Sequence, residues 1–448
     1  MIIKQRCKLK KKAAVINLGC PKNQVDSEVI SGLLAERYEL TSNPQEANIV
    51  LVNTCGFIND AKEESIEVLC DIVELKSEGV CEKVYALGCL AQRYGKELVK
   101  EIPELDGVLG DGELHNIVSI IESDDNQRVF TWKETQDFLY THEMPRIRTG
   151  FTFSTYVKIA EGCDNRCSYC AIPGIKGSYR SRNKESVLEE TKRLAGEGTK
   201  EIILVAQDLT RYGLDLYGKQ ELPSLLKEMV RIDGLEWIRL MYCYPDVLTD
   251  ELIDIIALEP KICNYLDIPL QHGDNEILAR MNRRNTREQA EQLIEKLRSR
   301  IPEIFIRSTF ITGFPGETER HFQNLQSFIK RMRFDRLGVF AYSQEENTPA
   351  GKMKDQVPSA VREARKDSLM AMQAELVNEI QQKRIGRSLK MILEEELPDG
   401  WRGRSEGDAP EIDGQVYCKT FQGHSSGDII NVKILQADSY DLWGEELE

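Results

Sequence analysis

Three cysteines lie close together in the stretch Gly162-Cys163-Asp164-Asn165-Arg166-Cys167-Ser168-Tyr169-Cys170, directly after an apolar, strand-like run at 156–160. Thiolates with this C-x3-C-x2-C spacing can hold an iron–sulfur cluster, each sulfur binding one iron. Three ligands leave one iron of a four-iron cluster open, and an open position on a metal implies chemistry rather than a purely structural role. The alternatives are a zinc knuckle or buried thiols. Zinc favours a fourth Cys or His nearby, and none follows.

The spacing resembles that of the radical S-adenosylmethionine (SAM) enzymes. The resemblance implies that the open iron binds the methionine part of SAM, and that one electron cleaves SAM to a 5′-deoxyadenosyl radical. It also implies that Cys163, Cys167 and Cys170 are the ligands of a 4Fe–4S cluster.

Bulk properties describe a globular protein of two or three domains. Of its 448 residues 41% are hydrophobic and 30% are charged. The net charge of −15 argues against strong nucleic-acid binding and favours basic partners.

The lysine-rich segment 1–12 and the short apolar run after it imitate a lipoprotein signal, but Asn17 interrupts that run. No run is long enough to span a membrane. We expect a cytoplasmic protein with a basic N-terminal tail. Twelve cysteines could suggest disulfides, but clusters of closely spaced thiols in a long chain with ample apolar content are interpreted as metal ligands in a reducing compartment.

Residues 13–125 alternate apolar runs with helical patterns, which predicts an open α/β sheet. Three of the runs, at 14–19, 48–54 and 83–88, end at Cys20, Cys55 and Cys89 respectively. The carboxyl ends of neighbouring parallel strands meet at one edge of a sheet, so these three cysteines can converge. A second three-cysteine cluster site follows as a hypothesis, with structural thiols as the alternative.

Two helices are expected after the first two of these strands. Their apolar stripes contain Val25, Val29, Ile30 and Leu33 in the first, and Ile66, Leu69 and Val73 in the second. Cys70 falls on the apolar side of the second helix and is interpreted as a core residue. Residues 126–150 have no sustained periodicity and are interpreted as a linker.

From 151 to 385 six strand candidates recur, each followed by a helix, at 155–160, 201–206, 237–241, 264–269, 304–310 and 335–341. This repetition predicts a parallel sheet, and six units predict a partial (β/α)6 barrel rather than a closed eight-stranded one. The usual core of radical SAM enzymes is such a barrel. Chemistry in these folds sits at the carboxyl ends of the strands.

Four residues are candidate SAM contacts: Tyr169, Gln207, Arg307 and Gly313. Tyr169 precedes the last cysteine, and Gly313 opens a Gly-Phe-Pro-Gly-Glu run that resembles the adenine-side motif of the family. A helix-capping turn explains that run equally well, and Arg307 can instead lie on a solvated strand end. His272 is a candidate acid or base or a satisfied structural group. Arg283 and Arg284 are interpreted as a solvated helix end.

The C-terminal part begins with a helix over 358–385 whose stripe is Leu369, Met372, Leu376 and Ile380. Short alternating strands at 389–393, 415–420, 429–434 and through Trp443 then predict a small β-barrel over 386–448. From residue 384 onward there are seven Lys and Arg against fourteen Asp and Glu, a net charge of −7. An acidic barrel should repel RNA and attract a basic protein, although the charge can also serve only solubility.

The C-terminal barrel resembles the TRAM module, usually RNA-binding, that ends the chains of the methylthiotransferases. Three further motifs resemble the N-terminal domain of the same enzymes. They are Leu18-Gly19-Cys20-Pro21-Lys22-Asn23, Asn53-Thr54-Cys55 and Gly88-Cys89. The resemblance implies an auxiliary 4Fe–4S cluster on Cys20, Cys55 and Cys89, whose open iron carries the inserted sulfur. Three other runs resemble the branch that modifies an aspartate of a small-subunit ribosomal protein: Met241-Tyr242-Cys243-Tyr244-Pro245, Asp267-Ile268-Pro269-Leu270-Gln271-His272 and Ala409-Pro410-Glu411-Ile412-Asp413-Gly414.

The implied reaction is insertion of a methylthio group at the aspartate β-carbon. A first SAM supplies the radical that removes a hydrogen, a second SAM donates the methyl group, and an electron donor such as a flavodoxin-type protein drives the cleavage. One alternative is a tRNA adenosine methylthiotransferase with the same chemistry. The other is a non-catalytic iron–sulfur electron carrier, which would not cleave SAM.

Overall fold

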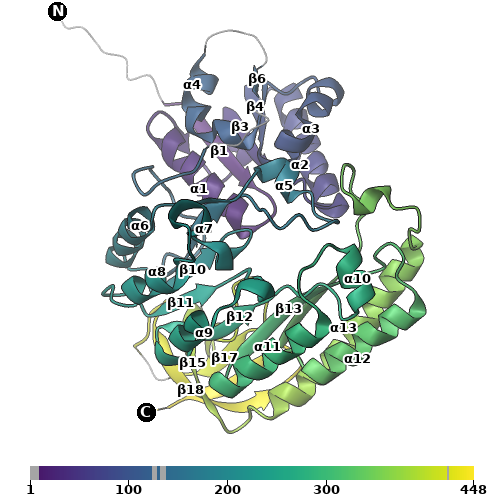
Figure 1. Cartoon of the computed structure of the whole chain (residues 1–448). Coiled ribbons are helices and arrows are strands. Elements are labelled where there is room, and N and C mark those ends of the chain that lie inside the picture. Colours follow the sequence, from purple (N-terminus) through teal and green to yellow (C-terminus); the bar gives the residue numbers. More distant parts are fainter. Residues whose placement is uncertain (1–9, 124–128, 132–137, 421–422, 448) are drawn as a thin grey trace, which may run out of the picture. The chain divides into compact units, whose positions relative to one another are not determined.

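A computed structural model describes residues 10–123, 129–131, 138–420 and 423–447 (Figure 1). The chain forms two compact units. The N-terminal unit contains residues up to 150 together with 161–164 and 170–180, and the C-terminal unit contains 151–160, 165–169 and the chain from 181 onward. Most of the expected basic tail, residues 1–9, lies outside the described residues. Within the described residues, no helix is both long and apolar enough to cross a membrane.

The N-terminal unit is built on a six-stranded parallel sheet in the order β2-β1-β3-β4-β5-β6. The strands are β1 (Lys12–Asn17), β2 (Glu39–Leu40), β3 (Ile49–Thr54), β4 (Lys83–Leu87), β5 (Gly107–Leu109) and β6 (Val129–Thr131). The three strands that precede the cysteines, β1, β3 and β4, are therefore neighbours, as the sequence predicted. β6 lies inside the expected linker 126–150. A three-residue edge strand is too short to produce a visible periodicity.

Helices follow all three of these strands: α1 (Pro21–Ala35), α2 (Asn59–Ser77) and α3 (Gly88–Glu101). The unit also contains α4 (Ile117–Glu122), α5 (Ile172–Lys176) and the 3-10 helices η1 (Pro44–Glu46) and η2 (Asp111–Asn116). The buried face of α2 carries Ser65, Leu69 and Ile72. Ile66 is 42% exposed and Cys70 is exposed, so the prediction that Cys70 belongs to the core was wrong. Each residue turns an α-helix by about 100°, which carries Ile66 and Cys70 away from the sheet.

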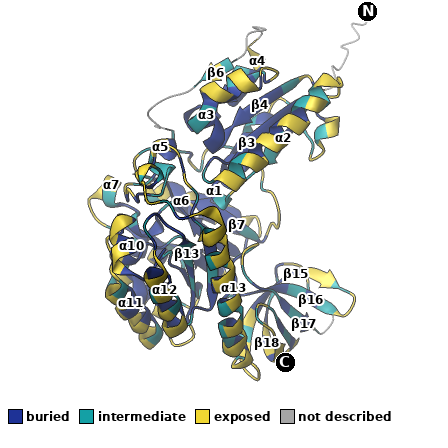
Figure 2. Ribbon diagram, turned by 90° about the vertical axis from the view of Figure 1, so that its right-hand side faces the viewer, coloured by how far each residue is buried: buried dark blue, intermediate teal, exposed yellow. Residues whose placement is uncertain are grey.

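The C-terminal unit contains six parallel strands in the order β14-β13-β12-β11-β10-β7, which confirms the open partial barrel. They are β7 (Ser154–Lys158), β10 (Glu201–Val205), β11 (Trp237–Leu240), β12 (Ile262–Asp267), β13 (Phe305–Thr312) and β14 (Arg336–Ala341). Two short strands, β8 (Ala160–Glu161) and β9 (Arg180–Ser181), flank the cysteine loop. In Figure 2 the strands of this sheet are largely dark blue, and the outer faces of the helices are yellow.

The connecting helices are α6 (Lys184–Gly196), α7 (Leu214–Tyr217), α8 (Leu222–Met229), α9 (Asp250–Leu258), α10 (Asn275–Arg280), α11 (Arg287–Arg300), α12 (Glu319–Met332) and α13 (Ser359–Gln382), with 3-10 helices η3 (Leu209–Arg211), η4 (Pro245–Val247) and η5 (Ala350–Lys352).

α13 packs on β13 and β14 through Leu369, Gln373, Val377 and Gln381, one position away from most of the expected stripe. The Gln373 amide donates to the Phe334 carbonyl (2.8 Å), which makes a polar residue suitable for this buried face.

The chain ends in a closed five-stranded barrel in the order β15-β16-β17-β19-β18. Its strands are β15 (Ser388–Leu397), β16 (Gly400–Ser405), β17 (Val416–Lys419), β18 (Ile429–Ala437) and β19 (Leu442–Glu446). The sequence did not reveal β16, whose two glycines and two arginines give no strand-like alternation. Its Arg404 is fully buried and binds Glu201, the first residue of β10, at 2.6 Å.

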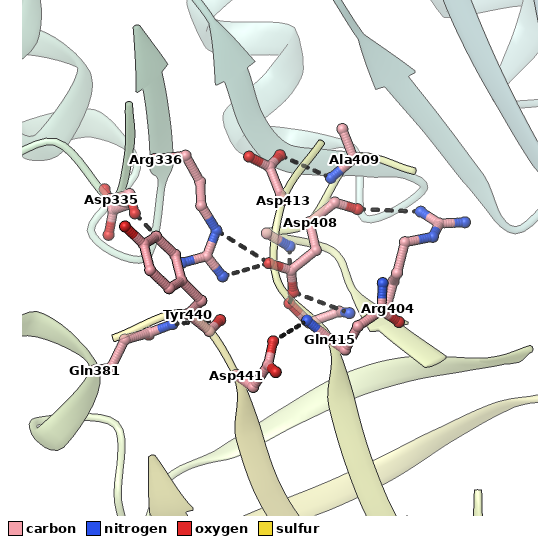
Figure 3. A network of polar contacts seen from close by, with 12 residues as sticks. Asp335, Arg336, Gln381, Arg404, Asp408, Ala409, Asp413, Gln415, Tyr440 and Asp441 are labelled. Atoms are coloured by element: carbon pink, nitrogen blue, oxygen red, sulfur yellow. Dashed lines mark hydrogen bonds and ion pairs between the residues drawn. The ribbon is translucent and has the colours of Figure 1, made fainter. Parts of the chain in front are cut away.

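The segment 406–414, which follows β16, lies against the amino-terminal ends of the partial-barrel strands (Figure 3). Arg336 of β14 pairs with Asp408, and the Tyr265 hydroxyl of β12 donates to Asp413 at 2.7 Å. The side chains of Asp408 and Asp413 are 1% and 2% exposed. Part of the acidity counted for this barrel is therefore buried and neutralised by arginines, and does not contribute to its surface.

Candidate active site

Cys20, Cys55 and Cys89 lie at the carboxyl ends of three adjacent strands in the N-terminal unit. Cys20 is the residue that caps α1, Cys55 follows β3 directly, and Cys89 is the second residue of α3. Cys55 and Cys89 are buried, and Cys20 is half-buried. The order of the strands thus brings the three cysteines to one edge of the sheet.

The loops that carry these cysteines pack tightly on one another. Gly19 has φ +93°, and a Cβ atom there would lie 3.0 Å from the Cys55 Sγ and 2.8 Å from its Cβ, so only glycine fits. The Asn23 amide donates to the Leu18 carbonyl (3.0 Å) and the Thr54 carbonyl (3.2 Å), tying two of the loops together. Its Oδ1 lies 3.8 Å from the Cys89 Sγ. Asn23 belongs to the motif quoted above, but its linking role required the structure.

The electrostatic surroundings of these thiols include a buried lysine that the sequence did not single out. Lys176, at the end of α5, lies 2.9 Å from Asp111 and 3.7 Å from Asp26. Burial would lower the pKa of Lys176, but Asp111, Glu161 and Cys89 together raise it well above its usual value. Burial raises the pKa of Cys55 and of Cys89, and the lysine charge opposes that rise. The ammonium group therefore favours the thiolate forms that bind metal.

The second group of cysteines lies in the loop after β8. At its start, the Cys163 N–H donates to the Gly177 carbonyl (3.1 Å), and Gly162 adopts φ +82° with no room for a Cβ atom beside the Ser178 carbonyl. At its centre, the Asn165 amide donates to Asp208 (2.7 Å) after β10. Ser168 binds the Met281 and Arg280 carbonyls. The loop is thus fixed by hydrogen bonds at several points without regular secondary structure.

Cys167 is buried against two side chains of the C-terminal unit. Its Sγ lies 3.2 Å from the Tyr244 hydroxyl oxygen and 3.9 Å from Nη1 of Arg283. Arg283 is 7% exposed, so its interpretation as part of a solvated helix end was wrong. Burial raises the pKa of Tyr244, and the hydroxyl keeps its proton. No local sequence signal distinguishes Arg283 from Arg284, because the environment of each is set by distant segments.

The two cysteine groups fit iron–sulfur clusters better than single metal ions. Four thiolates around one zinc lie roughly 4 Å apart, given a Zn–S distance of about 2.3 Å. Within the described residues, the only group of three potential ligands gathered within 4.8 Å is Asp274, Glu276 and His321. Neither group of cysteines therefore has its three sulfurs as close together as a single zinc ion requires. Asp274 there caps α10 by accepting backbone N–H groups. None of the described cysteines forms a disulfide.

Among the SAM candidates, the structure brings Tyr169 and the Gly313 turn together. Tyr169 packs against the apolar cluster that contains Phe314 and Tyr342. Gly313 has φ +70°, and its N–H donates to Glu317 at 3.0 Å. Gln207 is half-buried just beyond the end of β10.

Arg307 lies elsewhere, near the start of β13. It precedes Gly313 by six positions along an extended strand, a distance of roughly 20 Å. Its guanidinium lies 3.1 Å from Asp267 and 3.5 Å from Asp413. The alternative of a solvated strand end was wrong, since the side chain is 14% exposed.

His272 has a polar neighbour at each ring nitrogen. Its Nδ1 accepts the Asp274 N–H (3.0 Å), and its Nε2 lies 3.3 Å from Glu317. Glu317 also binds Arg365 (2.8 Å). These contacts connect the turn at 313–317 to the segment after β12 and fit the structural role.

Comparison with known proteins identifies each part of the chain. Residues 157–329 match the radical SAM superfamily, 12–110 match the uncharacterized protein family UPF0004, and 385–446 match the TRAM domain. Among solved structures, the radical SAM methyltransferase TsrM from Kitasatospora setae aligns with a TM-score of 0.55 at 17% identity over 77% of each chain. The cobalamin-dependent enzyme OxsB aligns with a TM-score of 0.51 at 13% identity over 83% of this chain and 56% of that one. These two likenesses concern the fold.

Relatives with much higher identity extend over nearly the whole chain. A protein of Desulfitobacterium hafniense named ribosomal protein uS12 methylthiotransferase RimO is 53% identical over 98% of this chain and 99% of its own length. The protein of the same name from Heliobacterium modesticaldum is 48% identical over 98% and 95%. With its radical SAM core, its strand-terminal cysteines and its TRAM barrel, the chain belongs to the RimO family of radical SAM methylthiotransferases.

Proposed function

We propose that this enzyme inserts a methylthio group at the β-carbon of an aspartate in ribosomal protein uS12. The observation that carries the proposal is the 53% identity, over 98% of the chain, to a relative named for that activity. The cysteine pattern supports it, because both groups of three are present at the positions that the resemblance assigns.

We assign Cys163, Cys167 and Cys170 to the 4Fe–4S cluster that binds SAM, and Cys20, Cys55 and Cys89 to the auxiliary 4Fe–4S cluster. Once bound, the SAM-binding cluster supplies the one-electron cleavage that side-chain acids and bases cannot perform. The protein holds the thiols in place and keeps Cys55, Cys89 and Cys167 away from solvent. The Lys176 ammonium opposes the rise that burial causes in the pKa of Cys55 and of Cys89.

We further assign Tyr169 and Gly313 to the adenine side of the SAM site, since Tyr169 packs against the apolar cluster that contains Phe314, the residue after Gly313. Gln207 remains a candidate because it follows β10 at the same end of the barrel as the cysteine loop. Arg307 stays a prediction whose support is weaker, because two carboxylates already bind its guanidinium.

The surface of the C-terminal barrel supports a basic protein substrate. After the buried ion pairs are set aside, exposed acids remain at the β15–β16 hairpin and elsewhere on the barrel: Glu395, Glu396, Asp399, Glu411, Asp438 and Glu445. Proteins that bind ribosomal RNA are basic, and complementary charge speeds the encounter of two proteins. The same charge disfavours tRNA.

The remaining assignments follow from this substrate. We propose a cytoplasmic enzyme that receives its electrons from a flavodoxin-type protein. We also propose a domain division into 13–125, 151–385 and 386–448, which the three family matches support.

The test offers uS12 and total tRNA separately to the anaerobically reconstituted enzyme, with SAM, dithionite and sulfide. Mass spectrometry then follows the replacement of hydrogen by a methylthio group. We expect the gain on one aspartate-containing peptide of uS12, with tRNA unchanged. A gain on tRNA alone would overturn the substrate assignment and leave the two-cluster chemistry intact. Absence of SAM cleavage would overturn both and favour an electron carrier.

A further inference from the structure

The sulfur of Cys167 has two polar neighbours whose role the reaction described above does not include. Its Sγ lies 3.2 Å from the Tyr244 hydroxyl oxygen and 3.9 Å from Nη1 of Arg283. The three residues come from separate segments: the cysteine loop, the turn after β11 and the turn after α10. All three side chains are buried, so water does not compete for these contacts.

Tyr244 and Arg283 are both held in place by other groups. The Tyr244 N–H donates to the Thr210 hydroxyl (3.2 Å), which in turn donates to Asp208 (2.6 Å). The Arg283 Nη2 donates to the Pro269 carbonyl (2.6 Å), and its guanidinium carbon lies 3.8 Å from the centre of the Tyr244 ring. The stacked pair thus presents a fixed hydroxyl and a fixed positive charge to one sulfur.

The direction of the hydrogen bond follows from the chemistry of a ligand thiolate. A cysteine bound to iron carries no proton and can only accept, so the Tyr244 O–H must donate to it. A guanidinium does not lose its proton in proteins, so Arg283 remains positive. Hydrogen bonds and positive charge at cluster sulfurs favour the reduced cluster and raise its reduction potential.

We propose that Tyr244 and Arg283 are positioning residues that set the reduction potential of the cluster on Cys163, Cys167 and Cys170, by donating a hydrogen bond and a positive charge to the Cys167 sulfur. The inference rests on the proposed function in that these cysteines hold a 4Fe–4S cluster. It assigns to this pair the control of how readily that cluster accepts the electron for SAM cleavage.

The test uses the full chain with Cys20, Cys55 and Cys89 changed to alanine, so that one cluster gives the whole signal. Potentiometric titration followed by electron paramagnetic resonance measures the potential in Tyr244→Phe, Arg283→Gln and Arg283→Lys. Two matched controls are Arg284→Gln, the exposed neighbour, and Tyr212→Phe, a buried tyrosine whose hydroxyl donates to the Arg182 carbonyl.

We expect a more negative potential in Tyr244→Phe and in Arg283→Gln, partial recovery in Arg283→Lys, and no shift in either control. The two shifts should not add, because the side chains are in contact. Unchanged potentials at normal iron content would overturn the proposal. If Tyr244→Phe fails to retain iron, the two Arg283 variants decide, and unchanged potentials in both overturn it.

The same preparations separate this inference from the proposed function. A chain that binds no iron without Cys20, Cys55 and Cys89 would refute the assignment of the SAM-binding cluster itself. Shifted potentials together with an unmodified uS12 would refute only the substrate and leave the role of Tyr244 and Arg283 standing.

Discussion

The Nζ of Lys176 lies 2.9 Å from the Oδ2 of Asp111, and the two side chains are 4% and 9% exposed. Lys176 follows the cysteine loop by only six residues, whereas Asp111 begins η2 in the N-terminal sheet domain. The ion pair therefore anchors the chain that leaves Cys170 within the N-terminal unit.

Replacing this lysine should destabilise the N-terminal unit strongly. Lys176→Met leaves Asp111 and Asp26 buried without their cation, which typically costs about 3–5 kcal/mol. We expect a clear fall in the midpoint of thermal unfolding followed by circular dichroism. Lys192→Met, which removes an exposed lysine paired with Glu189, should change the midpoint little. Equal effects of the two variants would contradict the anchoring role.

Acid should weaken the contact between the C-terminal barrel and the partial barrel. Burial alone would raise the pKa of Glu201, but the Arg404 and Arg239 guanidiniums offset it and lower the pKa from 4.5 to about 2. A lowered pKa stabilises the fold above pH 4.5, and the contribution of about 3 kcal/mol disappears as the pH falls toward 2. Urea unfolding should therefore show a difference in the free energy of unfolding between wild type and Glu201→Gln at pH 7, and this difference should decrease in acid. A free-energy difference that does not change with pH would contradict the ion pairing.

Iron content should divide between the two groups of cysteines. The triple variant Cys20→Ala, Cys55→Ala, Cys89→Ala should retain about half of the iron and still cleave SAM, because each group holds one four-iron cluster. The triple variant at Cys163, Cys167 and Cys170 should also retain about half but cleave none. Cys81→Ala, which removes another buried thiol of the N-terminal unit, should leave iron content unchanged. Complete loss of iron in the first triple variant would contradict the cluster assigned to Cys163, Cys167 and Cys170. Complete loss in the second would contradict the cluster assigned to Cys20, Cys55 and Cys89.

Gly313→Ala should weaken SAM binding more than it weakens the fold. The new Cβ would lie 2.3 Å from the Arg362 Cγ at a φ of +70°, a strain of about 1 kcal/mol or more. The turn beside Tyr169 must shift to relieve it. Equilibrium dialysis of SAM against the reconstituted protein checks this expectation. Gly196→Ala, where a Cβ meets no atom within 4 Å, serves as the control and should bind SAM normally.

Charge reversal on the β15–β16 hairpin should slow the encounter with uS12. Glu396→Lys combined with Asp399→Lys should lower the association rate, with the effect shrinking at high salt, because exposed charges act mainly on the rate of encounter. Asp233→Lys with Glu236→Lys, two exposed acids of the partial-barrel domain, provides the matched control. Stopped-flow binding at two ionic strengths measures both. A similar decrease in the control would show that only net charge matters.

Much of the fold and of the cysteine sites was predictable, because both depend on local patterns and on one topological rule. Apolar runs that end in Cys20, Cys55 and Cys89 needed only the rule that parallel strands end at a shared edge. The short strands β6 and β16 were missed because neither carries a clear alternation. Helix faces were less predictable: Cys70 fell one residue outside the buried stripe of α2, and Gln373 occupies a buried position of α13 because a backbone carbonyl accepts its amide.

The residues around the cysteines could not be found in the same way, because distant segments determine their environment. Arg283 and Arg284 are adjacent in sequence, yet only Arg283 is buried beside Cys167. Lys176 belongs to a short helix with no marked charge pattern, and its partners lie about 65 and 150 residues away in the chain. Asp408 and Asp413 were counted as acidic surface, although arginines of the partial barrel neutralise them.

The path of the backbone through the cysteine loop has a consequence for the modularity of this protein. The chain crosses between its two units at 150/151, 160/161, 164/165, 169/170 and 180/181. A fragment cut after residue 150 would lack 161–164 and 170–180, including Lys176 and the thiols of Cys163 and Cys170. The matching C-terminal fragment would carry those pieces without the surface on which they fold. A single cut therefore cannot divide this chain into two complete units.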